Sequence, residues 1–273
     1  DKVTRFEDEH KHPMNIDSMT ADDLRVFADF LSSDYDISMN TIVTNMTLMR
    51  TVCNWVRKQG VTNNDPFFGY DMPKALYGTP YFLTIQERDQ VLDADLTDDA
   101  ELAEYRDMFV FQCMVGCRHS DLVTFTPKNI IDGVLEYIPI KTKGKLGDVV
   151  RVPLIPKAMA ILDGHDHGDD EPIFPKHYNF KFNDAIRRIL KRAKVNRVVT
   201  VINPKTRLEE KKPISDVATS HLARRTFIGN LYRMVKDPDL VASMSGHAKG
   251  SVAFARYRVI DDDMKKSLVE LIQ

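Results

Sequence analysis

The sequence predicts a mainly helical protein with small antiparallel β-hairpins, divided into two domains. Apolar residues recur at helical spacing through most of the chain, as Ile42, Met46 and Cys53 do. Short β-branched runs, bounded by turn residues such as Asp132-Gly133, interrupt that pattern. The stretch from Asp65 to Pro80 is rich in proline, glycine and aromatic residues and has no period, which indicates a linker between the two domains.

Size and composition exclude several classes of protein. The 273 residues, 43% apolar and 29% charged, are typical of a globular protein and not of a fibrous or disordered one. The sequence has no apolar run near 18 residues and no charged-then-apolar leader, so we expect no membrane partner, no export and a cytoplasmic location. Cys53, Cys113 and Cys117 lack metal-type spacing and are predicted to be buried thiols of a reducing compartment. Because the chain begins with Asp1, we expect a fragment of a longer protein.

Residues 1–75 are predicted to form an all-helical module, with a linker at residues 76–83. A capping box at Thr20 to Asp23 opens a helix that runs through Leu31, and a longer helix covers residues 40–60. The polar side of the longer helix could lie against a sugar-phosphate backbone, although an ordinary solvated helix face has the same composition. Its members are Asn40, Thr41, Thr44, Asn45, Thr47, Arg50, Thr51, Arg57 and Lys58.

Residues 84–273 are predicted to form a second domain of helices and β-hairpins. A capping box at Thr84 to Glu87 opens its first helix. Two β-rich runs predict a small antiparallel sheet, with one turn at Asp132-Gly133 and another at residues 142–147. The expected strands lie at 130–141 and 148–154, with a second hairpin at 198–214. The expected helices cover 84–92, 100–115, 156–162, 178–192, 220–235, 240–244 and 261–272.

Polar residues that can grip a phosphate are placed near expected helix ends. Arg118 follows Gly116, where the long helix is expected to stop. Asp121 could pair with the Arg118 guanidinium and hold it in one orientation, although a routine surface ion pair fits the same spacing. His221 and Arg224 stand three apart in a segment of helical period, so both can touch the same anion.

A turn and a tyrosine follow that helix. Asp237-Pro238 ends it, and Gly246 is expected to cap the next short helix, which places His247 at the mouth of a turn. Tyr257 stands ten residues further on. A tyrosine hydroxyl has a pKa of about 10, so it attacks phosphorus only if its proton is removed or the phosphate is made strongly electrophilic. Neighbouring cations would do the second.

Charge is unevenly distributed along the chain. The formal net charge is −2, but residues 176–258 contain 19 Lys and Arg against 6 Asp and Glu. Phosphate contacts would be made where this positive charge is concentrated, although solvated helix faces would give the same count. Two histidines among carboxylates in Gly164 to Asp170 suggest a metal, but the all-polar, glycine-flanked stretch favours a solvent loop, and we expect no metal or other cofactor.

The order and spacing of these residues resemble those of the tyrosine recombinase, or phage integrase, family. The resemblance rests on Arg118 in Gly116-Cys-Arg-His-Ser-Asp-Leu122, then His221-x-x-Arg224, then Gly246-His247, then Tyr257. Within the family, Ala223 to Tyr232 and Phe254 to Arg258 look most like integrases of conjugative transposons and similar mobile elements. The likeness covers nearly the whole chain, and the motifs are specific in combination because all occur in one order.

The resemblance implies a two-domain architecture, with a helical core-binding domain and an α+β catalytic domain that together clamp DNA. It implies that Tyr257 attacks the scissile phosphate without a metal, forming a 3′-phosphotyrosyl link and releasing a 5′-hydroxyl. Arg118 and Arg224 would stabilise the transition state, supported by Asp121. His221 and His247 would hydrogen-bond the phosphate or help move the nucleophile's proton.

A lysine on the β-hairpin is expected to be the general acid that protonates the departing 5′-oxygen. The resemblance favours Lys141, which directly precedes Thr142, although Lys143 and Lys145 are close enough in sequence to contest the role. Further DNA contacts are expected from Asn40, Thr41, Arg50, Lys143, Lys205, Arg207 and Arg225.

The resemblance also implies partners. We expect double-stranded DNA at recombination sites, a monomer that becomes a homotetramer on synapsed DNA, a nucleoid-associated location and possibly an accessory DNA-bending protein. The tail past Tyr257 is expected to pack on a neighbouring subunit, with packing on its own domain as the alternative. A type IB topoisomerase uses nearly the same residues, and a DNA-binding regulator that has lost catalysis is a further alternative. The intact set of site residues argues against the regulator, which has no use for a nucleophile.

Overall fold

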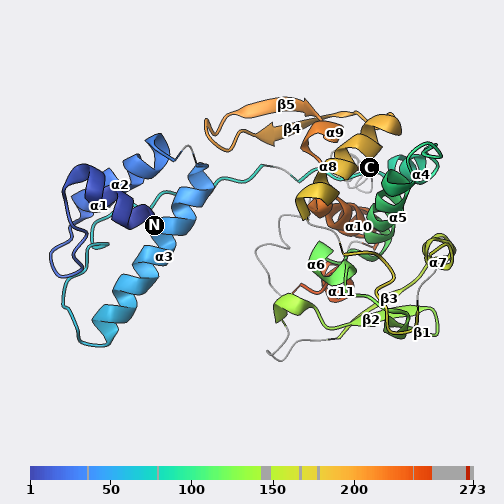
Figure 1. The fold of residues 1–273 in the computed structure, drawn as a ribbon, viewed down its shortest axis with the longest axis horizontal. Helices are drawn as coiled ribbons and strands as arrows, with labels where there is room; N and C mark the ends of the chain where they lie inside the picture. The colour runs from blue at the N-terminus through green and yellow to red at the C-terminus, as the bar shows by residue number, and fades with distance from the viewer. Residues whose placement is uncertain are drawn as a thin grey trace. The chain divides into compact units, whose positions relative to one another are not determined.

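The computed structural model describes residues 1–35, 37–78, 80–142, 149–165, 168–176, 179–235, 237–247 and 269–270. The chain divides into two compact units, Asp1–Gly78 with Val201–Glu210 and Thr79–Thr200 with Lys211–Gln273. The first is called the N-terminal unit below and the second the C-terminal unit. The predicted class, mainly helical with small antiparallel sheets, is confirmed (Figure 1).

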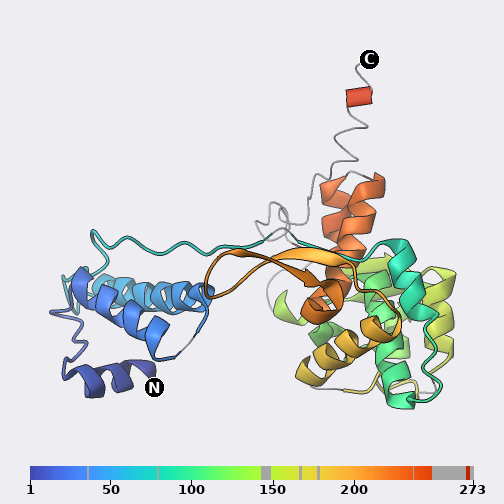
Figure 2. The same ribbon diagram turned by 90° about the horizontal axis from the view of Figure 1, so that it is seen from above.

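The N-terminal unit is built from helices α1 (Lys2–His10), α2 (Ala21–Ser33) and α3 (Met39–Lys58) (Figure 2). The predicted capping box before α2 is confirmed, because Thr20 and the Asp23 side chain satisfy each other's backbone N–H groups. The sequence analysis missed α1, whose buried residue Phe6 stands among charged ones. Its ring lies 5.2 Å from Phe27, and aromatic contacts of this kind hold α1 on α2. The core consists of Phe6, Met19, Leu24, Phe27, Phe30, Leu31, Ile42, Met46, Cys53 and Phe67.

The predicted second hairpin is confirmed as β4 (Val198–Ile202) and β5 (Glu209–Pro213). Its tip, Val201–Glu210, belongs to the N-terminal unit. There the carbonyl of Pro204 accepts a 3.1 Å hydrogen bond from the backbone N–H of Met39, at the first residue of α3. The hairpin tip therefore satisfies one of the backbone donors that every helix leaves open at its start.

The C-terminal unit is centred on α5 (Ala100–Val115), whose last eight residues are all buried, and on α10 (Ser220–Val235), which packs against it (Figure 1). Both helices have the predicted bounds. The helices α4, α7 and α8 pack around α5. The remaining helices of the unit are α4 (Ile85–Leu92), α6 (His119–Leu122), α7 (Pro156–Asp163), α8 (Asn179–Arg192), α9 (Ile214–Val217) and α11 (Pro238–Ser245).

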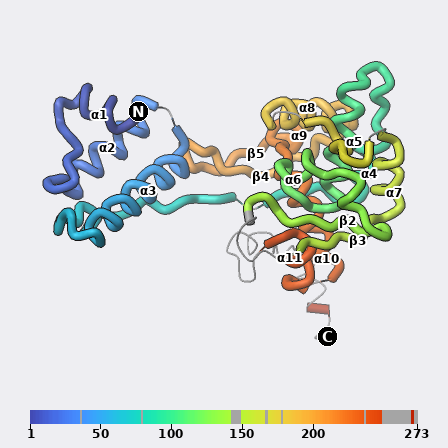
Figure 3. The backbone as a smooth tube through the Cα atoms, turned by 60° about the horizontal axis from the view of Figure 1, so that its bottom comes forward, coloured from blue at the N-terminus to red at the C-terminus, as the bar shows by residue number. Residues whose placement is uncertain are grey.

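The predicted antiparallel sheet is confirmed, with strand order β1-β2-β3. It consists of β1 (Ile130–Ile131), β2 (Val134–Tyr137) and β3 (Val150–Pro153), with the 3-10 turns η1 (Pro127–Asn129) and η2 (Ile140–Thr142) beside it. Asp132 and Gly133 have φ values of 50° and 75°, as a two-residue hairpin turn requires. Leu135 faces Val152 across the ladder, and both are buried. Helix α11 packs on β3 (Figure 3).

Two expectations of local structure were wrong. The strand predicted to reach Lys141 ends at Tyr137, because Pro139 has no N–H for a ladder and the N–H of Ile140 bonds to the Asp121 carboxylate instead. His165, predicted to lie in a solvent loop, is largely buried with 15% of its side chain exposed, and its Nε2 lies 3.5 Å from Asp107.

Metal and membrane features were also searched within the described ranges. They contain no group of three or more His, Cys, Asp or Glu side chains arranged to hold a metal ion. None of the helices in the same ranges combines the length and apolar character needed to span a membrane.

Candidate active site

Arg224 is the buried centre of the site, with only 2% of its surface exposed. Its Nη1 donates a 2.8 Å hydrogen bond to the carbonyl of Gly116, at the C-terminus of α5, where the helix dipole favours a cation. Gly116 adopts φ 70°, and a Cβ there would lie 2.2 Å from the ring of Phe227. The close packing of α5 on α10 at this glycine therefore fixes the guanidinium.

His247 lies beside Arg224, at the predicted place just after the Gly246 cap of α11. The Arg224 Nη2 lies 3.0 Å from His247 Nδ1 and 3.1 Å from Nε2. Burial and then the positive charges of Arg224 and Arg118 lower the pKa of His247 to about 3. The imidazole is therefore neutral at neutral pH.

Arg118 is the N-cap residue of α6, just past the end of α5 as predicted. Its Nη1 lies 4.0 Å from Oδ2 of Asp121, which is an electrostatic contact and is too long for the predicted hydrogen-bonded pair. Both atoms are buried, and neither makes a hydrogen bond within the part of the chain that the structure describes. This leaves one donor of a fixed guanidinium available to an anion.

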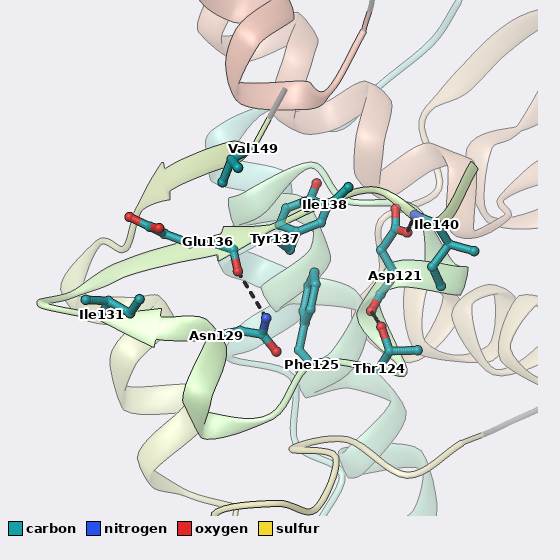
Figure 4. Close-up of a pocket in the computed structure, with 10 residues that line it drawn as sticks. All are labelled: Asp121, Thr124, Phe125, Asn129, Ile131, Glu136, Tyr137, Ile138, Ile140 and Val149. Carbon is teal, nitrogen blue, oxygen red and sulfur yellow. Dashed lines mark hydrogen bonds between the residues drawn. The ribbon is translucent and has the colours of Figure 1, made fainter. Parts of the chain in front are cut away.

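Asp121 has a second role that the sequence did not indicate. Its carboxylate is 2% exposed, and Oδ1 accepts a 2.9 Å hydrogen bond from the backbone N–H of Ile140, the first residue of η2 (Figure 4). Lys141 is the next residue, with its side chain on the exposed surface of this turn. One carboxylate therefore lies against Arg118 and holds the turn that carries Lys141.

His221 is exposed at the start of α10, one helical turn before Arg224. Surrounding protein displaces water from part of the ring and lowers its pKa, and the positive charges of Arg225, Arg224, Arg118 and Lys141 lower it further. Four cations therefore act on one imidazole, which indicates a strongly positive local potential.

A pocket of about 340 Å³ lies among these residues, and its wall includes Arg118, His221 and Arg224. The structure thus brings together residues that are more than a hundred positions apart in the sequence. A second hollow, shown in Figure 4, lies on the other side of Asp121 against β2 and is lined mainly by apolar residues.

Side chains that support the site were missed by sequence reasoning. Ser245, which is fully buried, contacts His247 Nδ1 at 2.9 Å. Asn183 of α8 accepts a 2.8 Å hydrogen bond from the N–H of Ser220, which holds the start of α10. Gln112 donates a 3.0 Å hydrogen bond to the carbonyl of Cys117, beside Arg118. Of these, only Ser245 carried a sequence signal, because it directly precedes the Gly246-His247 motif.

Tyr81, Phe82 and Leu83, expected in the linker, lie along α10. The Leu83 N–H donates a 3.0 Å hydrogen bond to Thr226, and the Tyr81 hydroxyl donates to the carbonyl of Val217 at 2.9 Å. The guanidinium of Arg225, a predicted DNA contact, lies 5.1 Å from the centre of the Tyr81 ring. These residues help to fix the helix that carries His221 and Arg224.

The other predicted DNA contacts have mixed surroundings. The Asn40 amide exchanges hydrogen bonds with the backbone of Leu76, at 2.7 and 2.9 Å. Arg207 donates a 3.1 Å hydrogen bond to the carbonyl of Lys74. Thr41, Arg50 and Lys205 have exposed side chains. The threonine hydroxyls further along α3 turn back onto the helix, so they present methyl groups outward: Thr44, Thr47 and Thr51.

Part of the predicted site lies outside the described residues. The nucleophile Tyr257 belongs to this part, as do Lys143, Lys145 and most of the expected helix at 261–272. The site geometry therefore rests on Arg118, Asp121, Lys141, His221, Arg224 and His247.

The fold and the cation-lined pocket define a protein of the tyrosine recombinase class. The model of the phage integrase family matches residues 81–264. The chain therefore belongs to the phage integrase family, the tyrosine-type site-specific recombinases.

Solved structures share the fold at low sequence identity. The Tn1549 transposon integrase in complex with transposon right end DNA is 15% identical, with a TM-score of 0.70 over 99% of this chain and 91% of that one. A lambda integrase dimer bound to a core site is 12% identical, with a TM-score of 0.67 over 96% and 88%. XerH recombinase bound to its difH substrate is 15% identical, with a TM-score of 0.63 over 100% and 77%. The search of curated proteins found no match.

Proposed function

We propose that this protein cuts and rejoins DNA strands at specific sites through a 3′-phosphotyrosyl intermediate, with Tyr257 as the nucleophile. The reaction exchanges one phosphodiester for another, so it needs neither ATP nor hydrolytic water. The observation that carries this proposal is the convergence of Arg118, His221, Arg224 and His247 around one pocket. Such a cluster matches a phosphate that gains charge in the transition state.

Each side chain has a role that its surroundings support. Arg224, held by the Gly116 carbonyl, and Arg118, with an unused buried donor, would bind the non-bridging phosphate oxygens. Lys141 would protonate the departing 5′-oxygen, and Asp121 holds the turn from which it acts. His221 and His247 are neutral, so they would act as hydrogen-bonding groups or accept a proton.

The partner is double-stranded DNA at recombination sites. The solved relatives named above are a transposon integrase with transposon end DNA, an integrase with a core site and a recombinase with its substrate. By this likeness, residues 1–75 act as a core-binding domain and residues 84–273 as the catalytic domain, joined by residues 76–83. The active form would be a homotetramer on paired sites of a mobile element, and we include an accessory DNA-bending protein as a further partner of that complex.

Covalent trapping tests this function. The wild-type chain is incubated with nicked suicide duplexes that carry candidate recombination sites, without added metal, and a denaturing gel is used to detect a protein–DNA adduct. We expect an adduct with the wild type, none with Tyr257→Phe, and an unchanged adduct with Tyr232→Phe, which removes a hydroxyl from the same unit.

The outcomes separate the alternatives. An adduct that survives Tyr257→Phe would overturn the nucleophile assignment. Binding to a verified site without any adduct would favour a DNA-binding regulator. Relaxation of supercoiled plasmid without site preference would favour a topoisomerase-like activity.

A further inference from the structure

Ser245 is the feature of the site that the proposed mechanism does not yet use. It is fully buried at the end of α11, and its Oγ lies 2.8 Å from the carbonyl of Val241 and 2.9 Å from Nδ1 of His247. A serine hydroxyl has one proton to donate and can also accept. The direction of these two hydrogen bonds decides which nitrogen of His247 carries the proton.

One assignment satisfies every contact of this group. If Ser245 donates to the Val241 carbonyl, which can only accept, then it accepts from Nδ1–H of His247. The Arg224 guanidinium, which can only donate, then donates to the lone pair of Nε2 at 3.1 Å. Each hydrogen bond in this chain has one donor and one acceptor.

The opposite tautomer conflicts with the same geometry. With the proton on Nε2, the Nδ1 lone pair would face two donors, the Ser245 hydroxyl and Arg224 Nη2. The Nε2–H would point at Arg224 Nη2, 3.1 Å away, which offers no lone pair. A contact between two donors costs free energy at a buried site.

We propose that Ser245 is a positioning residue that holds His247 in the tautomer with the proton on Nδ1, so that Nε2 presents a lone pair to the active site. This inference rests on the proposed function and narrows it, because non-bridging phosphate oxygens can only accept hydrogen bonds. In this tautomer His247 does not donate to the phosphate. It accepts a proton instead.

The proton transfer balances as follows for strand cleavage. Nε2 of His247 takes the hydroxyl proton of Tyr257 and becomes an imidazolium, with Nδ1–H still on Ser245. The phenolate forms the new bond to phosphorus, the bond from phosphorus to the 5′-oxygen breaks, and Lys141 protonates that oxygen. Rejoining reverses both transfers. In the protein alone, Arg224 and Arg118 lower the pKa of His247 after burial does, and a bound phosphate would offset these two charges.

The first test measures the tautomer itself. Nitrogen-15 NMR of the full chain reports which imidazole nitrogen is protonated, and the His247 signals are assigned by their loss in His247→Gln. We expect a protonated Nδ1 in the wild type and in Ser245→Thr, which keeps the hydroxyl, and a mixture or the reverse in Ser245→Ala. Ser243→Ala is the matched control, because the Ser243 hydroxyl also donates to a backbone carbonyl of α11, at 2.7 Å, but is exposed and distant from His247 in its bonding.

The second test measures strand cleavage on the suicide duplex. Ser245→Ala is expected to slow adduct formation roughly tenfold or more, because a misplaced proton removes part of a general-base contribution of about 10²- to 10⁴-fold. Ser245→Thr should restore much of the rate, and Ser243→Ala should equal the wild type.

Several outcomes would overturn the inference. A wild-type His247 protonated at Nε2 would do so without any variant, and so would Ser245→Ala that keeps the Nδ1 proton. Failure of the proposed function is a separate result, seen as a wild type that forms no adduct, and the NMR measurement still decides the role of Ser245 in that case.

Discussion

The two arginines of the site are held in different ways. Arg224 is 2% exposed and is fixed on one side by the Gly116 carbonyl and on the other by His247. The Arg118 side chain is 22% exposed, and its acidic neighbour Asp121 stands 4.0 Å away with a carboxylate that also holds the Ile140 N–H. Arg224 is thus part of the packed core, whereas Arg118 shares its support with the turn that carries Lys141.

This difference predicts different consequences of mutation. A change at Arg224 alters a buried cation and the helix packing around it, so it should affect both stability and catalysis. A change near Arg118 should act on the position of two groups, the guanidinium and Lys141, with little effect on the core. The following variants test this distinction.

Arg224→Lys should give the largest effect. An ammonium cannot reproduce the planar fork that reaches both the Gly116 carbonyl and His247, so a phosphate contact would also be lost. We expect adduct formation to fall by about 10²- to 10³-fold, the usual effect of removing one transition-state donor. Single-turnover cleavage of the suicide duplex measures this.

Arg233→Lys is the control for that experiment. Arg233 lies further along α10, with its guanidinium 4.9 Å from the centre of the Phe82 ring. Its rate should stay within about twofold of the wild type, since a surface substitution changes stability little. Equal loss in the two variants would show that any cation change on α10 is harmful and would remove the special place of Arg224.

Gly116→Ala should break the packing that holds Arg224. Gly116 has φ 70°, and the new methyl carbon would lie 2.2 Å from the Phe227 ring. Backbone strain and overpacking together should cost about 2 kcal/mol or more in the free energy of unfolding. Calorimetry of the C-terminal unit's transition measures the change.

Gly133→Ala separates strain from overpacking. Gly133 has φ 75°, but a Cβ there meets no atom within 4 Å. Its cost should be only about 1 kcal/mol, from the left-handed backbone alone. An equal cost in the two variants would mean that the contact with Phe227 relaxes freely.

The sequence predicted most of the fold because the signals for helix ends are local. The capping boxes at Thr20 and Thr84 and the left-handed glycines Gly116 and Gly246 mark ends that the structure confirms. The 3-10 turn of Lys141 was not predictable. It depends on a hydrogen bond from Ile140 to Asp121, 19 residues earlier in the chain, and no local pattern encodes that contact.

The charge count also required the structure. Part of the positive charge in residues 176–258 is paired with acidic residues of the preceding segment, since Arg188 lies 2.8 Å from Asp99 and Arg197 lies 2.8 Å from Glu87. These cations are less available to a phosphate than their number suggests. Composition gives the total charge, and only the fold shows which charges are already compensated.

The candidate site was predicted in its members and not in its geometry. Sequence order gave Arg118, His221, Arg224 and His247 as residues of one site, and the structure brings them to one pocket. The convergence joins Arg224 to Gly116 across 108 residues, which spacing alone cannot show. The assignment of catalytic roles, and of Tyr257 as the nucleophile, stays a prediction.

Asp121 variants test the link between Arg118 and Lys141. Asp121→Asn can keep the hydrogen bond from Ile140 but loses the charge near Arg118, whereas Asp121→Ala loses both. We expect adduct formation to fall roughly tenfold in Asp121→Asn and further in Asp121→Ala, because each change removes a hydrogen-bonded or charged partner worth about 1 to 3 kcal/mol.

A modified substrate identifies the cause of each loss. Sulfur in place of the bridging 5′-oxygen makes a leaving group that needs no proton, so it should bypass Lys141. The additional loss in Asp121→Ala should then disappear, while the loss in Asp121→Asn should remain. If sulfur rescued neither variant, the carboxylate would not act through the Lys141 turn.

Acid should weaken the C-terminal unit through its neutral histidine, which is the smallest effect. The pKa of His247 is about 3 in the folded chain, through burial and then Arg224 and Arg118, against about 6.5 for an unfolded histidine. Between these values the unfolded chain binds more protons, so the free energy of unfolding is fully present above pH 6.5 and falls as the pH decreases. Thermal unfolding between pH 7.5 and 5, where carboxylates stay ionised, should show a midpoint that drops with pH, and His247→Gln should flatten that slope. A slope unchanged by His247→Gln would mean that the imidazole is already solvated in the folded protein, and the fixed contact between His247 and Arg224 would then have to be abandoned.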